Sequence, residues 1–185
     1  MKNVTIILLF ITQAFSVKSQ SVSDSVRLLN SNEFRNDIAI RELRNNIAIR
    51  ELIDSFAYYA DRTKAQLQAA LFVETGTLEI YRSEPDTSKP IMVLKGRKEL
   101  EKAFKGLEKY NMTFHLNGQN SIKFGDDTTG TVHCLAHHIL FEAGKRILLT
   151  EGIRYYDTYT RQNNKWLFVK RKLIIDWEDK RLSTP

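Results

Sequence analysis

The spacing of apolar residues divides the chain into a helical first half and a strand-rich second half. From Ile47 to about Tyr59, apolar side chains recur three and four positions apart, which predicts an amphipathic helix. Short helices and strands are predicted after it, over 64–72, 77–81, 92–94 and 97–107. Beyond residue 110 the apolar period changes to two, which predicts long strands.

Tight polar turns join the long segments, and this pattern is typical of antiparallel hairpins. The predicted strands cover 113–124, 128–142, 146–160 and 165–177. Helices followed by a meander of strands indicate an α+β fold, in which the helices cover one face of a curved sheet. The length of 185 residues suits one such domain.

The first residues are typical of a signal peptide. Lys2 precedes an apolar run from Val4 to Phe15, and Val17 and Ser19 are small enough for cleavage after residue 19. The run is shorter than the roughly 20 residues of a membrane-spanning helix. We therefore expect a secreted or periplasmic protein, with residues 1–19 removed and no stable membrane span afterwards.

A nine-residue segment occurs twice in tandem. Residues 35–43 and 44–52 differ only in having Asp37 in the first copy and Asn46 in the second. Nine residues of an α-helix turn through about 900°, so equivalent side chains in the two copies face opposite sides. We expect the second copy to belong to the fold and the first to an exposed extension. The predicted organisation is an extension over 20–44, a domain over 45–178 and a tail over 179–185.

Composition and charge exclude several classes of protein. Hydrophobic residues make up 42% and charged residues 27%, which is normal for a globular domain. The net charge is +6, but the basic residues alternate with acidic ones, so nucleic-acid binding is not expected. Cys134 is the single cysteine, so no internal disulfide can form, and we interpret it as a core residue.

Several short motifs occur in an order that resembles a known family. They are Ile49–Leu52, Ala60–Arg62, Ala70–Phe72, Thr113–Gly118, Gly125–Asp126, Gly152–Asp157, Lys165–Trp166 and Asp176–Trp177. Together they resemble SnoaL-like domains of the nuclear transport factor 2-like superfamily, over about residues 45–178. The resemblance implies a cone-shaped, cystatin-like sheet around a pocket. The family includes dehydratases, relatives of steroid isomerase and non-catalytic dioxygenase β-subunits.

The resemblance implies catalytic roles for Asp61, His115 and a histidine of the 128–142 strand. Imidazole titrates near neutral pH, and a carboxylate can orient it for acid–base chemistry. Alternation along the strand places His137 on one face and His138 on the other, and we expect His137 to face the pocket. No short-spaced ligand pair accompanies these residues, so neither a metal nor a cofactor is expected.

The predicted pocket wall is largely aromatic and consists of Phe56, Tyr59, Phe72, Tyr81, Arg171 and Trp177. Arg171 interrupts an apolar row on the last strand, and a buried arginine needs a partner. That partner is either Glu151 or Asp157 on the neighbouring strand, or a ligand carboxylate. Family dehydratases often have a tyrosine five residues before the aspartate, where this chain has Phe56.

Two functions follow from the resemblance. One is a lyase or isomerase that uses Asp61 and His115 on a small, oxygenated and mostly apolar substrate. The other is a non-enzymatic domain that binds a small hydrophobic molecule or serves as an accessory subunit. Because such sheets commonly pair across one face in this superfamily, a homodimer is also expected.

Overall fold

The computed structural model describes residues 4–82 and 88–183, with side chains described at residue 31 and from residue 33 onward within those ranges. Contacts divide the chain into two units, Met1–Asn45 and Asn46–Pro185. The helices are α1 (Val4–Asp61), α2 (Ala65–Ala70), α3 (Gly96–Phe104) and the 3₁₀-helix η1 (Lys105–Lys109). The strands are β1 (Phe72–Tyr81), β2 (Met92–Lys95), β3 (Met112–Lys123), β4 (Thr128–Glu142), β5 (Lys145–Gln162) and β6 (Lys165–Leu182).

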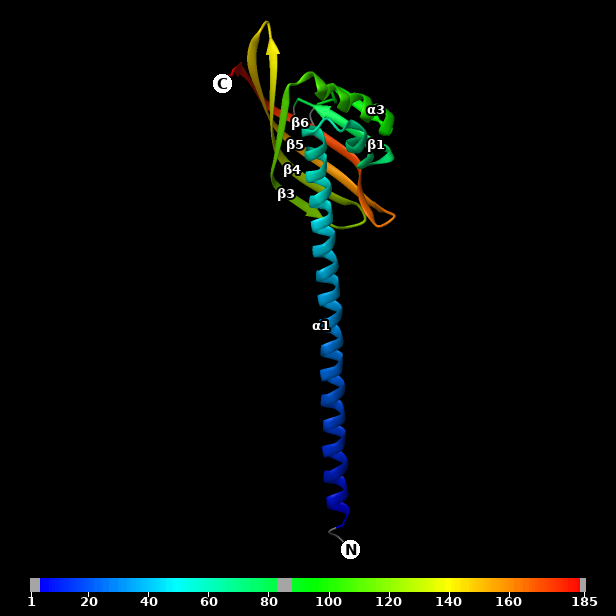
Figure 1. Ribbon diagram of the computed structural model, residues 1–185. Helices are drawn as coiled ribbons and strands as arrows, with labels where there is room; N and C mark the ends of the chain where they lie inside the picture. The colour runs from blue at the N-terminus through cyan, green and yellow to red at the C-terminus, as the bar shows by residue number, and fades with distance from the viewer. Residues whose placement is uncertain (1–3, 83–87, 184–185) are drawn as a thin grey trace. The chain divides into compact units, whose positions relative to one another are not determined.

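Six strands form one sheet in the order β2-β1-β6-β5-β4-β3 (Figure 1). Strands β1 and β6 are parallel, and every other neighbouring pair is antiparallel. The last turns of α1, together with α2 and α3, pack on one face of this sheet. The predicted α+β fold is therefore confirmed. Strand β6 continues to Leu182, so residues 179–182 belong to the sheet and not to a tail.

The two copies of the repeat differ in burial along helix α1. Ile49 and Leu52 of the second copy are 0% and 6% exposed, whereas their equivalents Ile40 and Leu43 are 48% and 62% exposed. The second copy supplies the apolar side of the helix that packs into the core. Among the described residues, no helix is both long enough and apolar enough to cross a membrane. The side chains of the predicted signal peptide, residues 1–19, lie outside the described ones, so its cleavage stays a prediction.

An ion pair lies at the centre of the aromatic core. Arg171 is 1% exposed and donates to both carboxylate oxygens of Asp157, at 2.8 and 2.7 Å. Its guanidinium carbon is 4.4, 4.0 and 4.1 Å from the ring centres of Phe56, Tyr155 and Phe168. Burial lowers the pKa of Arg171, but the charge and hydrogen bonds of Asp157 outweigh burial and raise it overall. Asp157 is therefore the partner of Arg171.

A bulge in β6 changes which side chains face the helices. Ile153 of β5 is paired with Ile175, but the preceding Gly152 is paired with Trp177, so Asp176 is an extra residue in β6. One inserted residue moves the following side chains to the opposite face of the sheet. Trp177 consequently lies over Gly152 on the outer face, where it is 51% exposed. A Cβ at Gly152 would meet this indole ring, so the close approach requires glycine.

Candidate functional site

A cavity of about 250 Å³ lies between the helices and the inner face of the sheet. Its wall is mostly apolar and comes from α1, β1, β2, α3 and β6, with side chains that include Phe56, Leu78, Ile80, Leu94, Phe104 and Leu173. Two histidines and a glutamate of the neighbouring strands β3, β4 and β5 also line it: His115, His138 and Glu151. Binding sites for small molecules combine a few polar groups with an apolar wall in this way.

The end of α1 holds His115 in place from behind the cavity wall. Asp61 is the last residue of α1, and its Oδ1 is 2.6 Å from His115 Nδ1. The backbone N–H of His115 donates to Asp61 Oδ2 at 3.0 Å, and the Thr113 hydroxyl donates to Oδ1 at 3.2 Å. Because a carboxylate accepts at Nδ1, the neutral imidazole has its lone pair at Nε2. The structure thus brings Asp61 and His115 together, with only His115 lining the cavity.

Asp61 stays ionised in this position. Partial burial raises its pKa, but the hydrogen bonds from the His115 side chain and backbone, together with the charge of His115, outweigh burial. The pKa of Asp61 is consequently below its ordinary value of 3.8. An ionised carboxylate at Nδ1 both fixes the ring and stabilises the imidazolium that forms when Nε2 takes up a proton.

A second histidine and carboxylate lie beside the first pair. His138 Nε2 is 3.3 Å from Glu151 Oε2, and the His138 side chain is 3% exposed. The ring stacks on Tyr110, with centroids 4.3 Å apart, and meets the His115 ring edge-on at 5.4 Å. Within the described part of the chain, His138 Nδ1 has no hydrogen-bond partner. Two imidazoles, each with a carboxylate at one nitrogen, therefore line one wall.

The expectation that His137 faces the cavity is wrong. His137 lies on the outer face, where its Nδ1 is 3.0 Å from the Thr150 hydroxyl, and His138 lies on the inner face. The alternation of side chains along β4 was predicted correctly, but not which face is inward. The inner face carries Val132, Cys134 and Ala136, which are all buried. Small and apolar neighbours were thus a better guide to the inward face than the histidines.

Only Phe56 of the predicted pocket residues lines the cavity. Phe72 is completely buried and packs on Phe168, with ring centroids 5.0 Å apart. Tyr59 does not line the cavity, because the side of helix α1 that faces it carries Phe56 and Ala60, one turn apart. The Tyr59 ring packs edge-on against Tyr58 instead.

Three other predicted pocket residues are absent from the wall for different reasons. Tyr81 follows Ile80 on β1 and so lies on the opposite face, where its hydroxyl donates to Glu79 at 2.8 Å. Arg171 has its guanidinium bound to Asp157 in the core. Trp177 is on the outer face because of the bulge at Asp176.

The sequence interpretation missed Glu151 and Tyr155 as residues of the cavity wall. Both belong to the same inward-facing set of β5 as Ile153, and a glutamate in such a set was a usable signal. Burial raises the pKa of Tyr155 well above its ordinary value, so its phenol stays neutral. Within residues 4–82 and 88–183, no group of three or more His, Cys, Asp and Glu side chains is arranged to hold a metal ion.

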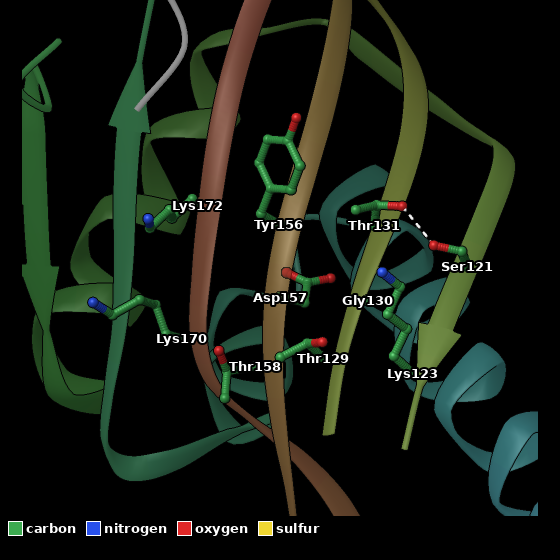
Figure 2. A pocket seen from close by; sticks show the side chains of 10 residues that line it. All are labelled: Ser121, Lys123, Thr129, Gly130, Thr131, Tyr156, Asp157, Thr158, Lys170 and Lys172. Atoms are coloured by element: carbon green, nitrogen blue, oxygen red, sulfur yellow. Dashed lines mark hydrogen bonds between the residues drawn. The ribbon is translucent and has the colours of Figure 1, made fainter. Parts of the chain in front are cut away.

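A second concavity, of about 380 Å³, lies on the outer face of the sheet (Figure 2). Its side chains are mainly hydroxyls and amines, including Thr131, Tyr156, Lys170 and Lys172, and Ser121 is hydrogen bonded to Thr131. Its described wall contains no histidine. The Asp61–His115 and Glu151–His138 pairs lie at the inner cavity instead.

The fold and this cavity define a SnoaL-like domain. Residues 41–172 match the SnoaL-like domain family, which is more than half of the chain. The chain therefore belongs to this family, within the nuclear transport factor 2-like superfamily. No curated protein matches the sequence significantly.

Solved structures with the same fold include a protein from Novosphingobium aromaticivorans assigned as a scytalone dehydratase. It is 23% identical, with a TM-score of 0.65, over 78% of this chain and 94% of that chain. A hexachlorocyclohexane dehydrochlorinase from Novosphingobium barchaimii is 17% identical, with a TM-score of 0.62, over 76% and 92%. A β-subunit assigned to an aromatic-ring-hydroxylating dioxygenase of N. aromaticivorans is 18% identical, with a TM-score of 0.61, over 74% and 92%.

Proposed function

We propose that this protein is a lyase or isomerase that removes a proton from a small, oxygenated and mostly apolar molecule bound in the inner cavity. The observation that carries the proposal is the position of His115, which lines an apolar cavity while Asp61 holds its other nitrogen at 2.6 Å. The volume of about 250 Å³ is below the usual 300–1,000 Å³ of sites for drug-sized ligands. A ligand of one or two rings suits that space.

In this mechanism His115 is the base and Asp61 is its positioning residue. His115 Nε2 takes a proton from a carbon next to a carbonyl, and Asp61 stabilises the resulting imidazolium through Nδ1–H. General base catalysis of this kind contributes about 10²- to 10⁴-fold to the rate. The apolar wall excludes water, which strengthens the Asp61–His115 interaction.

His138 is placed to serve as the acid. In an elimination, the electrons of the broken C–H bond form the new C=C bond, the C–O bond breaks, and the leaving oxygen receives a proton from His138. In an isomerisation, the proton taken by His115 returns to another carbon and His138 donates a hydrogen bond to the enolate oxygen. His138 takes this role here because Phe56 has no hydroxyl with which to polarise a carbonyl.

The names of two neighbours support the reaction class, because a dehydratase and a dehydrochlorinase both catalyse eliminations. The predicted signal peptide supports secretion or a periplasmic location, and the family supports a homodimer; both stay part of the proposal. The non-enzymatic alternative is a binding domain that uses the same cavity. It requires no proton transfer at His115.

The test is turnover of bicyclic β-hydroxy ketones, followed by the ultraviolet absorbance of the enone product. His115→Gln is expected to lower kcat/KM by at least about 100-fold, while His137→Gln, a histidine on the outer face of the next strand, keeps it within about twofold. In parallel, NMR should show a strongly hydrogen-bonded His115 Nδ1–H proton that is lost in Asp61→Asn. Equal turnover by His115→Gln and wild type would overturn the mechanism. Ligand binding without any turnover would favour the binding domain.

A further inference from the structure

Glu151 is the carboxylate of the inner cavity, and no lysine or arginine side chain lies beside it on the described wall. It is directly opposite Ala136 in the β4–β5 ladder, so it projects inward, and its side chain is 15% exposed. The nearby amide of Gln68 donates to the Phe56 carbonyl at 3.2 Å. Glu151 therefore sets the charge that a ligand meets.

No lysine or arginine of the described cavity wall neutralises this carboxylate, and His138 does so only when it is protonated. Arg171 is bound through two nitrogens to Asp157 in the core. His138 is 3.3 Å from Glu151, which is longer than the 2.7–2.9 Å of a strong charge-assisted hydrogen bond. When His138 is neutral the pair carries one negative charge, and when it is protonated the pair is neutral overall. In neither state does the wall offer an unpaired positive charge.

His138 also has a buried nitrogen without a hydrogen-bond partner among the described residues. Its side chain is 3% exposed, and its Nδ1 has no hydrogen-bond partner among the residues that the structure describes. A buried polar atom without a partner is unfavourable, and a ligand that supplies one gains affinity. A hydroxyl can donate to Nδ1 when the ring is neutral, and a carbonyl can accept from it when the ring is protonated.

We infer that Glu151 selects uncharged or cationic ligands that carry a hydroxyl or carbonyl group, and excludes carboxylates. This inference rests on the proposal that the inner cavity is the ligand site, and it names the class of ligand. While His138 is neutral, a carboxylate in the cavity meets the like charge of Glu151 in surroundings of low dielectric constant, with no unpaired cation on the described wall to compensate. An ammonium group in the same position is attracted by the Glu151 charge that repels a carboxylate.

The experiment uses three probes with one bicyclic skeleton: 2-tetralol, 2-aminotetralin and tetralin-2-carboxylate. Their Kd values are measured at about pH 7.5 by calorimetry and by the NMR shifts of the His138 ring, for the whole chain without its signal peptide. For wild type, the carboxylate is expected to bind at least about tenfold more weakly than the alcohol. In Glu151→Gln that difference should shrink to about threefold or less, and the amine should lose about tenfold.

Glu142→Gln is the matched control, because it makes the same chemical change at an exposed residue of β4 that pairs with Lys180. It should keep the wild-type order of the three probes. The inference is overturned if wild type binds carboxylate and alcohol equally, or if Glu151→Gln leaves their ratio unchanged. If Glu151→Gln does not fold, the relative Kd values of the three probes for wild type still test the inference.

The outcomes also separate this inference from the proposed chemistry. If the probes bind in the expected order but His115→Gln does not slow turnover, only the mechanism is overturned and charge selection stands. If none of the probes binds wild type at millimolar concentration, the cavity is not the ligand site, and both proposals are overturned.

Discussion

Two of the pairs that join a carboxylate to a nitrogen-containing side chain, Asp157–Arg171 and Asp61–His115, differ in how completely their nitrogens are bound. In the core, Asp157 receives two hydrogen bonds from Arg171 and one from Tyr159, and both charged side chains are at most 1% exposed. At the end of α1, Asp61 binds only one nitrogen of His115, and the other nitrogen has no hydrogen bond to a described residue, on a side chain that lines the cavity. Asp157 belongs to strand β5 and Asp61 to the end of α1, and only Asp61 is connected to the cavity, through His115.

This difference separates a structural role from a chemical one. Arginine stays protonated in proteins, so its pairing with Asp157 cannot take part in proton transfer. Histidine exchanges a proton near neutral pH, so its pairing with Asp61 can.

Asp157→Asn should have the largest effect, because it leaves the Arg171 charge buried without a counter-charge. We expect it to lower the free energy of unfolding by about 3–5 kcal/mol, measured by urea denaturation at neutral pH. The control is Asp176→Asn, which breaks a partly exposed pair with Arg154 and should cost about 1 kcal/mol or less. Equal losses in the two variants would show that burial of the Asp157 pair does not matter.

Cys134, which packs in the same core, should be protected from thiol reagents. Burial raises its pKa from 9.0 to about 11, which reduces the thiolate fraction at about pH 8 by roughly 100-fold. We expect labelling by a disulfide reagent to be slow in the native protein and fast in denaturant. Similar rates in both conditions would contradict a solvent-excluded core beside Arg171.

Asp61→Asn should have the smallest effect on stability, about 1 kcal/mol at neutral pH. The pKa of Asp61 is lowered in the folded protein, so its contribution is present above pH 3.8 and is lost as the pH falls through the lower folded value. The difference between wild type and variant, measured by urea denaturation, should therefore shrink from pH 7 to about pH 3.

Asp54→Asn is the control for Asp61→Asn. Asp54 is an exposed residue of α1 that accepts a hydrogen bond from Asn117, so its substitution should change stability by about 0.5 kcal/mol or less at both pH values. A difference between wild type and Asp61→Asn that does not change with pH would mean that ionisation of Asp61 does not stabilise the fold.

The fold was predictable because its determinants are local. Helical spacing from Ile47 predicted the buried side of α1, and the polar turns marked the hairpins. The end of β6 was not predictable in the same way, because the bulge at Asp176 depends on the pairing of two strands. A period-two pattern contains no information about an inserted residue, so Trp177 was assigned to the wrong face.

The site was predictable only in part for a similar reason. Asp61 and His115 were identified through the resemblance to a family, and the structure brings them within hydrogen-bonding distance. His137 and His138 are adjacent, and choosing between them required knowing which face of β4 packs on the helices. That information comes from contacts between β4, the helices and β5, which sequence periodicity does not specify.

The tandem repeat in α1 has a consequence for how this chain can change over generations. Ile49 and Leu52 pack in the core while Ile40 and Leu43 are exposed, so the domain depends on one copy of a segment that the chain carries twice. Loss or gain of a copy during replication alters the length of the helix and leaves the packed copy with the same neighbours downstream. A change of length before the second copy therefore leaves the helix residues that line the cavity, Phe56 and Ala60, with the same packing.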